Sequence, residues 1–308
     1  LVTGGAGFIG RHTCVALIAA GYTPLVRDNL GNSDLRVLDR VERIAGRRPG
    51  WIEGDVRDRA LLDRVFAEHR IAGVIHFAGL KAVGDSVADP LGYYDNNVHG
   101  TWVLAQAMER AGVDTLVFSS SATVYGDPER SPIPEDAPCR PANPYGRSKR
   151  IVEETLADWH AARPGRRIAL LRYFNPVGAH ESGLIGEHPQ GRPNNLMPFV
   201  CQVAVGLRER LMVHGGDYPT PDGTGVRDYV HVMDLAEGHV AALRTAQASP
   251  GLLLTLNLGT GVGLSVLQVV QAFERASGRP IAYDIGPRRP GDVPAYWADP
   301  SRAEQVLG

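Results

Sequence analysis

Short apolar runs bounded by turn residues alternate with longer helical patterns through the first 175 residues. The helical patterns cover residues 8–20, 57–70, 97–111 and 148–161. This alternation predicts repeated β-α units around a parallel sheet. We therefore predict an α/β fold with a doubly wound parallel sheet, whose ligands bind beyond the carboxyl ends of the strands. The six predicted strands end near Val2, Asp28, Glu53, Phe77, Ser119 and Tyr173.

The pattern changes after residue 173. Proline, glycine and asparagine become frequent at residues 191–198 and 218–225, and the helical stretches become shorter. We predict a Rossmann domain over residues 1–173 and a smaller mixed α/β lobe over residues 174–308, parts of which return to the main sheet. Residues 175–190 are expected to form an ordered binding loop between the two.

The composition narrows the class of protein. With 44% hydrophobic and 21% charged residues, the 308-residue chain resembles an ordinary globular protein. The net charge of −2 provides no field to gather nucleic acid or an anionic membrane, and no apolar run approaches the roughly 18 residues that span a bilayer. Cys14, Cys139 and Cys201 form no CxxC pair, so we expect a reducing, cytoplasmic setting. The ten histidines show no metal-ligand spacing, so no metal is expected.

A glycine-rich turn follows the first strand. The segment TGGAGFIG satisfies GxGxxG through Gly5, Gly7 and Gly10, and GxxGxxG through Gly4, Gly7 and Gly10. Glycine permits a tight turn and a close backbone approach, so that a pyrophosphate can rest on the helix N-terminus. The turn predicts a dinucleotide site; alone, it also fits a plain strand-to-helix turn.

Asp28 ends the second predicted strand, where an acidic side chain can bind the adenosine ribose hydroxyls. Its carboxylate would repel a 2′-phosphate and so favours NAD over NADP, although the neighbouring Arg27 could accept such a phosphate. Asp55 is placed to accept a hydrogen bond from the adenine amino group. At residues 77–79 the fourth strand ends with small residues beside a bulky one. A cofactor that packs against the end of this strand requires such a pattern. A second glycine run at residues 259–263 lacks the last glycine spacing and is interpreted as a structural turn.

Tyr145 and Lys149 stand four residues apart at a predicted helix start, so both lie on one face. A neighbouring ammonium and an oxidised nicotinamide would stabilise the phenolate and lower the tyrosine pKa from its free value of about 10. Tyr145 could then accept an alcohol proton near neutral pH. Seen alone, the YxxxK spacing also fits an ordinary surface pair. Ser119 to Ser121 end the fifth strand, where a serine could hold the reacting oxygen or simply cap the strand.

Nine segments occur in an order that is similar to the UDP-glucose 4-epimerase family of extended short-chain dehydrogenase/reductases. They are TGGAGFIG, HFAGLKAV, YYDNNVHGT, FSSSATVYG, NPYGRSK, LRYFNPVGAH, NNLMPF, GTGVRDYVHV and PAYWAD. The resemblance covers nearly the whole chain, and its later segments belong to that family more than to the superfamily.

The resemblance implies NAD-dependent interconversion of UDP-glucose and UDP-galactose in galactose metabolism. Sugar C4 is oxidised, the 4-keto intermediate rotates, and the opposite face is reduced while NAD stays bound. In this family Tyr145 is the acid/base, Lys149 binds the nicotinamide ribose, and Ser121 hydrogen-bonds the sugar O4. The implied NAD-binding residues are Gly4, Gly7, Phe8, Ile9, Gly10, Asp28, Asn29, Asn32, Ser33, Asp55, Val56, Phe77, Ala78, Gly79, Lys81, Asn96, Ser119, Tyr145, Lys149 and Phe174.

The resemblance also implies a UDP-sugar site, and a homodimer. Arg227 and Arg289 would bind the diphosphate, because a guanidinium bonds anionic oxygens in pairs, although isolated arginines also fit solvated surface charge. Tyr296 is a bulky residue where the family selects against N-acetylated sugars; core packing is its alternative. The implied substrate residues are Lys81, Ser121, Tyr145, Asn175, Asn195, Leu196, Met212, Val213, His214 (the last three at the uracil), Arg227, Arg289, Asp292 (near the ribose) and Tyr296.

Three other functions fit part of the same sequence pattern. A nucleotide-sugar 4,6-dehydratase shares the glycine turn and the Tyr/Lys pair, but enzymes of that kind carry an Asp-Glu pair where this chain has Ala122 and Thr123. A net NAD-dependent dehydrogenase would exchange its cofactor during turnover. A redox-sensing module that binds NAD without chemistry would have lost the catalytic hydroxyl or ammonium.

Overall fold

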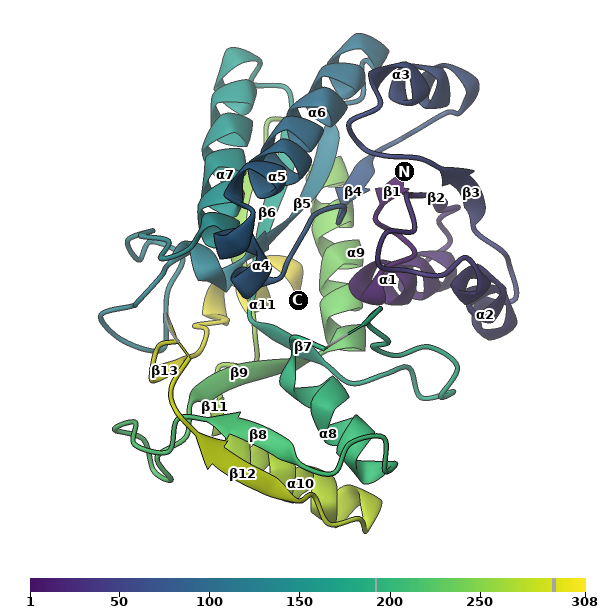
Figure 1. Cartoon of the computed structure of the whole chain (residues 1–308). Helices are drawn as coiled ribbons and strands as arrows, with labels where there is room; N and C mark the ends of the chain where they lie inside the picture. Colours follow the sequence, from purple (N-terminus) through teal and green to yellow (C-terminus); the bar gives the residue numbers. More distant parts are fainter. Residues whose placement is uncertain (192, 290–291) are drawn as a thin grey trace.

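The computed structural model describes residues 1–191, 193–289 and 292–308 (Figure 1). In this part of the chain, seven parallel strands form the main sheet in the order β10-β6-β5-β4-β1-β2-β3. Their bounds are β1 (Val2–Thr3), β2 (Leu25–Asp28), β3 (Gly50–Glu53), β4 (Val74–His76), β5 (Thr115–Ser121), β6 (Arg167–Tyr173) and β10 (Leu253–Leu258). The predicted α/β class is confirmed. Each of the six predicted strands ends within two residues of its predicted end, and β10 adds a seventh.

Helices cover both faces of this sheet (Figure 1). They include α1 (Phe8–Ala19), α2 (Arg36–Ala45), α3 (Arg59–Glu68), α6 (Gly100–Ala111), α7 (Pro144–Ala162), α9 (Val232–Ala248) and the C-terminal α11 (Ser301–Leu307). One apolar core joins the sheet to α1, α2 and α9, and a second joins it to α3, α6 and α7. On β5, Leu116 and Phe118 enter the second core while Val117 enters the first, because successive side chains of a strand point to opposite faces. Both α9 and β10 follow residue 174 in sequence, yet they belong to this main layer.

The remaining part of the C-terminal half forms the smaller mixed lobe. It contains β7 (Asn175–Val177), α8 (Leu196–Ala204), β8 (Leu211–His214), β9 (Val226–His231), β11 (Gly263–Ser265), α10 (Val266–Ser277), β12 (Tyr283–Gly286) and β13 (Ala295–Tyr296). Strand β9 lies between β11, which is antiparallel to it, and the parallel β7 and β13. Strand β8 pairs with β12, and this pair packs with α8 and α10 around Val200, Leu211 and Val270.

The glycine run at residues 259–263 is a structural turn, as predicted. The buried carboxylate of Asp228 accepts hydrogen bonds from the backbone N–H groups of Thr260 at 2.8 Å and Gly261 at 3.1 Å. It also accepts one from Ala298 N at 3.1 Å, so it ties this turn to the segment that follows β13. Among the described helices, none has both the length and the apolarity needed to cross a membrane.

Candidate active site

The turn between β1 and α1 packs tightly against the end of β4. Gly4 has a positive φ of 69°, and a Cβ there would lie 2.6 Å from the backbone nitrogen of Ala78. A Cβ at Gly10 would lie 2.4 Å from the carbonyl oxygen of Gly4. Gly7 is the N-cap of α1, so the first N–H groups of that helix face the turn. The geometry is that of a helix N-terminus able to receive an anion.

A cavity of about 240 Å³ lies beside this turn, over the carboxyl ends of the strands. Eleven residues predicted for the cofactor line it: Gly4, Asp28, Asn29, Asn32, Ser33, Asp55, Val56, Phe77, Ala78, Gly79 and Asn96. Arg27, considered above for a 2′-phosphate, also lines it, and so do Thr3, Gly31, Gly54 and Leu80, which the sequence did not indicate. The lining does not include Gly7, Phe8, Ile9, Gly10, Lys81, Ser119, Tyr145, Lys149 or Phe174. The cavity therefore corresponds to the adenosine end of the predicted site.

Asp28 organises the wall of this cavity. Its Oδ2 accepts a hydrogen bond from Ala6 N at 3.1 Å, while its Oδ1 accepts from Leu30 N at 2.8 Å and from Ser33 Oγ at 3.0 Å. The carboxylate thus joins the loop after β2 to the glycine turn. Its negative charge on the cavity wall is the feature that disfavours a 2′-phosphate.

Arg27 and Asp55 are both held by neighbours. The guanidinium of Arg27 is fully buried and donates to the backbone carbonyl of Asp55, and its burial lowers its pKa. Arg27 is therefore a buried cation at the cavity wall, with one guanidinium hydrogen bond to the backbone. The Asp55 carboxylate accepts from Arg57 Nε and Nη2, each at 2.8 Å, and from Asn29 Nδ2 at 3.1 Å. Arg57 holds the pKa of Asp55 well below its usual range, so the carboxylate stays ionised.

The start of α7 positions Tyr145 and Lys149. Asn143 caps the helix, its side chain accepting from Gly146 N at 2.9 Å, and Pro144 occupies the first helical position. The helix therefore begins four residues before the predicted stretch at 148–161. Lys149 Nζ donates to the Ser119 carbonyl oxygen at 2.8 Å and lies 6.0 Å from the ring centroid of Tyr145.

The two pKa values follow from the surroundings of these groups. Burial lowers the pKa of Lys149 to about 8, so its ammonium still carries most of its charge at neutral pH. Desolvation around the Tyr145 oxygen raises the pKa of that phenol to about 12, and a contact with Ser121 opposes the rise. The predicted fall of the tyrosine pKa assumes a bound oxidised nicotinamide and stays a prediction. Among the chain's own residues, desolvation dominates the pKa of this phenol.

The serines at the end of β5 have several partners. Ser121 Oγ accepts from Thr123 N at 3.2 Å and from Thr123 Oγ1 at 2.9 Å, and so caps the short helix η2 (Ala122–Val124). Ser119 Oγ is hydrogen-bonded to the Tyr173 hydroxyl. The capping role considered for these serines is present, and Ser121 still faces Tyr145.

Four predicted residues from the second half of the chain form one cluster. The Tyr296 hydroxyl donates to Asn175 Oδ1 at 3.2 Å, and its ring centroid lies 5.6 Å from that of Phe174. The guanidinium carbon of Arg227 lies 4.7 Å from the Tyr296 ring centroid. Strands β7, β9 and β13 bring these residues together, since Tyr296 is the register partner of Arg227. Tyr296 is also close enough to Tyr145 to raise its pKa. The cluster therefore adjoins the catalytic pair.

Glu187 links two further predicted residues. Its Oε1 accepts from Lys81 Nζ at 3.2 Å and from Asn195 Nδ2 at 2.6 Å. Glu187 could not be predicted from the sequence, because nothing in its spacing relates it to either partner. Residues 175–190, which contain it, therefore contact the β4 end, and Leu196 begins α8 directly after Asn195.

The last predicted substrate residues lie on the smaller lobe. Met212, Val213 and His214 belong to β8, but the Val213 side chain is buried in the lobe core, so that only its backbone could face a ligand. Arg289 Nε donates to Asp292 Oδ2 at 3.1 Å, so these two predicted residues pair with each other. Within the described residues, no three His, Cys, Asp or Glu side chains gather as metal ligands.

The sheet, the glycine turn and the Tyr145/Lys149 pair define a dinucleotide-dependent enzyme of the short-chain dehydrogenase/reductase class. Residues 1–259 match the model of the NAD dependent epimerase/dehydratase family. The chain is 60% identical to a UDP-glucose 4-epimerase from Yersinia pestis and 58% identical to one from Bacillus subtilis, and each comparison covers 100% of this chain and 91% of the relative. A crystal structure of UDP-glucose 4-epimerase from Bifidobacterium longum in complex with NAD+ and UDP matches with a TM-score of 0.96 and 56% identity, again over 100% and 91%.

The chain belongs to the NAD dependent epimerase/dehydratase family. The resemblance inferred from the sequence motifs is confirmed, and so is the prediction of NAD. The residues fit that cofactor: the open N-terminus of α1 suits the pyrophosphate, and the Asp28 carboxylate lies on the wall of the adjoining cavity.

Proposed function

We propose that this chain interconverts UDP-glucose and UDP-galactose through C4 oxidation, rotation of the 4-keto sugar and reduction of its opposite face. The carrying observation is that Tyr296, which clusters with Asn175 and Arg227, lies near enough to Tyr145 on the main domain to raise its pKa. This proximity brings an acid/base near groups suited to a nucleotide sugar. Relatives with up to 60% identity bear the name UDP-glucose 4-epimerase, which supports the same substrate pair.

Three residues of the chain have separate roles in the transfer of the hydroxyl proton. When bound at this site, NAD supplies the acceptor and donor for the C4 hydrogen. Tyr145 Oη takes the proton from the 4-hydroxyl and later returns one to the sugar oxygen. Ser121 Oγ hydrogen-bonds that oxygen, and the Lys149 ammonium stabilises the phenolate and would bind the nicotinamide ribose.

The residues after Ser121 argue against dehydration. Elimination of water requires an acid and a base beside the sugar, and this chain carries Ala122 and Thr123 at that point. Ala122 is buried against Val124 and Tyr125 in a small apolar cluster. The proposed outcome is therefore return of hydrogen to the same sugar carbon.

Incubation of the purified protein with UDP-galactose, without added NAD, tests the proposal. We expect UDP-glucose to form over many turnovers, because the cofactor is regenerated in each cycle and stays bound. If UDP-galactose is unchanged by protein shown to contain NAD, or if a 4-keto-6-deoxy sugar accumulates, the proposal is wrong.

Tyr296 is proposed to narrow the sugar site against N-acetylated substrates. We expect UDP-N-acetylglucosamine to be turned over poorly by the unchanged protein, and Tyr296→Ser to raise its kcat/KM by roughly 10-fold or more. The reason is that the smaller side chain removes the ring that packs beside Phe174 and fills this part of the site. Tyr283→Ser, at an exposed tyrosine on β12, is the matched control. Equal kcat/KM values for the N-acetylated and plain sugars in the unchanged protein would contradict this role.

We also propose that the chain forms a homodimer through the face around α6 and α7. Apolar side chains are exposed there, including Val87 on α4 (Val83–Ala88), Leu91 on α5 (Pro90–Tyr93) and Trp102 on α6. Beside them lies a cavity of about 460 Å³ whose walls include Trp102 and Trp159. Large exposed apolar side chains of this kind are typical of a protein interface.

Light scattering tests this assembly. We expect the unchanged protein to have twice the mass of a single chain, and Trp102→Glu to shift it toward the monomer, because a carboxylate would be buried without a partner. Leu207→Glu places the same charge at an exposed leucine beyond α8 and should leave the dimer intact. A monomer in the unchanged protein, or dissociation by both substitutions alike, would contradict the proposed interface.

A reducing, cytoplasmic setting is part of the same proposal. The three thiols are free, and Cys14 is fully buried in the core beside α1, where burial raises its pKa to about 12.

A further inference from the structure

Glu153 continues the row of catalytic residues along α7. Tyr145, Lys149 and Glu153 recur at intervals of four residues, so they lie on one face of the helix. Glu153 is only 2% exposed, lies one helical turn after Lys149 and does not line the cofactor cavity. The proton transfer described above does not use it.

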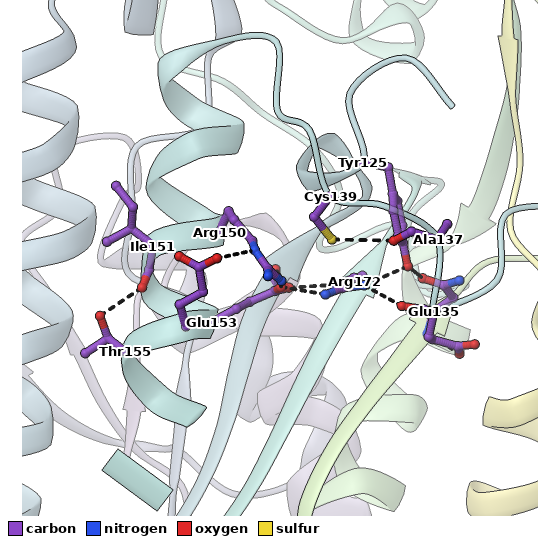
Figure 2. A network of polar contacts seen from close by, with 12 residues as sticks. Tyr125, Glu135, Ala137, Cys139, Arg150, Ile151, Glu153, Thr155 and Arg172 are labelled. Atoms are coloured by element: carbon purple, nitrogen blue, oxygen red, sulfur yellow. Dashed lines mark hydrogen bonds and ion pairs between the residues drawn. The ribbon is translucent and has the colours of Figure 1, made fainter. Parts of the chain in front are cut away.

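The Glu153 carboxylate is held by two neighbouring strands (Figure 2). Arg172 on β6 donates from Nε to Oε1 at 2.8 Å and from Nη2 to Oε2 at 2.7 Å. Ser120 on β5 donates from Oγ to Oε1 at 2.6 Å. Ser120 and Arg172 are register partners, so both side chains rise from the same face of the sheet toward α7. The paired guanidinium bonds fix the orientation as well as the distance of the carboxylate.

Arg172 is itself held from the opposite side. Its Nη1 donates to the Tyr125 hydroxyl and to the Glu135 carbonyl oxygen, each at 3.0 Å (Figure 2). The Tyr125 hydroxyl donates onward to Asn257 Oδ1 on β10 at 2.7 Å. The guanidinium and the carboxylate therefore occupy a buried, connected network that extends from α7 to the edge of the sheet.

This network meets the active site at three successive residues of β5. The Ser119 carbonyl accepts from Lys149, the Ser120 hydroxyl donates to Glu153, and Ser121 contacts Tyr145. A gain in stability does not by itself explain a buried ion pair at this position, because well-packed apolar side chains of similar volume often stabilise a protein as much or more. The ion pair between Glu153 and Arg172 instead fixes the position of α7, which carries Tyr145 and Lys149, relative to the neighbouring strands.

We propose that Glu153, clamped by Arg172 and Ser120, is a positioning residue that sets the geometry of Tyr145, Lys149 and Ser121 and balances the charge of Lys149. The role rests on the proposed epimerase function. Glu153 reaches neither sugar nor cofactor directly, so it acts through Lys149 and through the end of β5. Its loss should therefore affect the chemical step rather than substrate binding.

The charge around Lys149 comes from few groups. On its own helix these are Tyr145, whose phenol is protonated, Glu153, whose charge favours the ammonium, and Arg150, which pairs with Glu153 at 3.4 Å. From β4 comes His76, which is neutral because burial lowers its pKa to about 3. The charge of Arg172 is neutralised by its ion pair with Glu153. Removing the Glu153 charge lowers the pKa of Lys149 further, so the ammonium is lost at a lower pH.

Glu153→Gln tests the proposal, because it removes the charge and keeps the shape. We expect kcat for UDP-galactose to fall by roughly 10-fold or more, KM to change less than threefold, and the NAD content per chain to stay the same. We also expect the alkaline limb of the pH profile to move toward neutral pH by roughly one unit. A variant with unchanged kcat and an unchanged alkaline limb overturns the proposal.

Two control substitutions on the same helix separate positioning from stability. Asp158→Asn removes the charge of an exposed carboxylate farther along the same helix and should leave kcat and the pH profile unchanged. Val152→Ala removes buried apolar volume and should lower the unfolding temperature without moving the alkaline limb. If Val152→Ala moves the limb as much as Glu153→Gln does, the role is structural and the proposal fails.

Ser120→Ala is a second test of the proposal, which applies even if Glu153→Gln does not fold. It removes one hydrogen bond to Glu153 and leaves the ion pair with Arg172 in place. We expect a smaller fall in kcat, with KM unchanged; an unchanged kcat overturns the proposal. Failure of the epimerase function itself is distinguishable, since the unchanged protein would then produce no UDP-glucose.

Discussion

Tyr145→Phe is expected to lower the interconversion of UDP-glucose and UDP-galactose by roughly 10²–10⁴-fold, the usual contribution of a positioned acid/base. The substitution removes the phenolic oxygen and keeps the ring that packs at the start of α7. The glycine turn, Asp28 and the 240 Å³ cavity are untouched, so the NAD content per chain should not change. The measurement is kcat together with the absorbance of NAD released on denaturation.

Tyr22→Phe is the matched control for this result. The Tyr22 hydroxyl donates to Gln247 Oε1 at 2.9 Å between α1 and α9, outside the residues that form the site. Its loss should leave kcat within about twofold, since the net worth of one such hydrogen bond is about 1 kcal/mol of stability. If Tyr145→Phe retains kcat within the same range, another group is the acid/base.

Lys149→Met is expected to lower kcat by roughly 10²–10³-fold and to change the pH dependence. Methionine keeps the length of the side chain and removes both the charge and the donor to the Ser119 carbonyl. Without the ammonium, the pKa of Tyr145 rises further, and less phenolate is available at any given pH. A pH profile of kcat from pH 6 to 10 for both proteins is the measurement.

The sign of the expected pH effect follows from the pKa of Lys149. That pKa is about 8, so the ammonium is present below pH 8 and is lost as the pH rises through it. The unchanged protein should therefore lose rate above about pH 8, and Lys149→Met should lack this limb. Arg147→Met removes an exposed cation two residues earlier on α7 and should preserve the limb. A limb near pH 8 that persists in Lys149→Met would contradict the assignment.

The sequence predicts best those features of the structure that are formed by residues close together in the chain. The turn from Gly4 to Gly10 and the Tyr145/Lys149 pair lie within single strand-turn-helix or helical units, so residue spacing alone determines which side chains share a face. The period of the apolar positions likewise identifies the first six strands. Strand β10 was missed because its run LLTLNL lies beyond the change in pattern at residue 173, where no alternation with helices marks it.

Contacts between distant segments were not predictable in the same way. Glu187 joins Lys81 to Asn195, and Arg172 joins Glu153 to Tyr125, but no spacing relates these residues. The burial of the Tyr145 phenol is not predictable from its motif for a related reason. A motif shows which charges are neighbours in sequence, whereas desolvation depends on everything that packs around the phenol.

The central claim is that hydrogen removed from C4 returns to the same sugar. It is tested most directly with UDP-galactose that carries deuterium at C4, incubated with the protein and excess unlabelled NADH. The account predicts UDP-glucose that retains the deuterium at C4, because the cofactor does not leave during turnover. Loss of the deuterium from the product to the added cofactor or to water would contradict it.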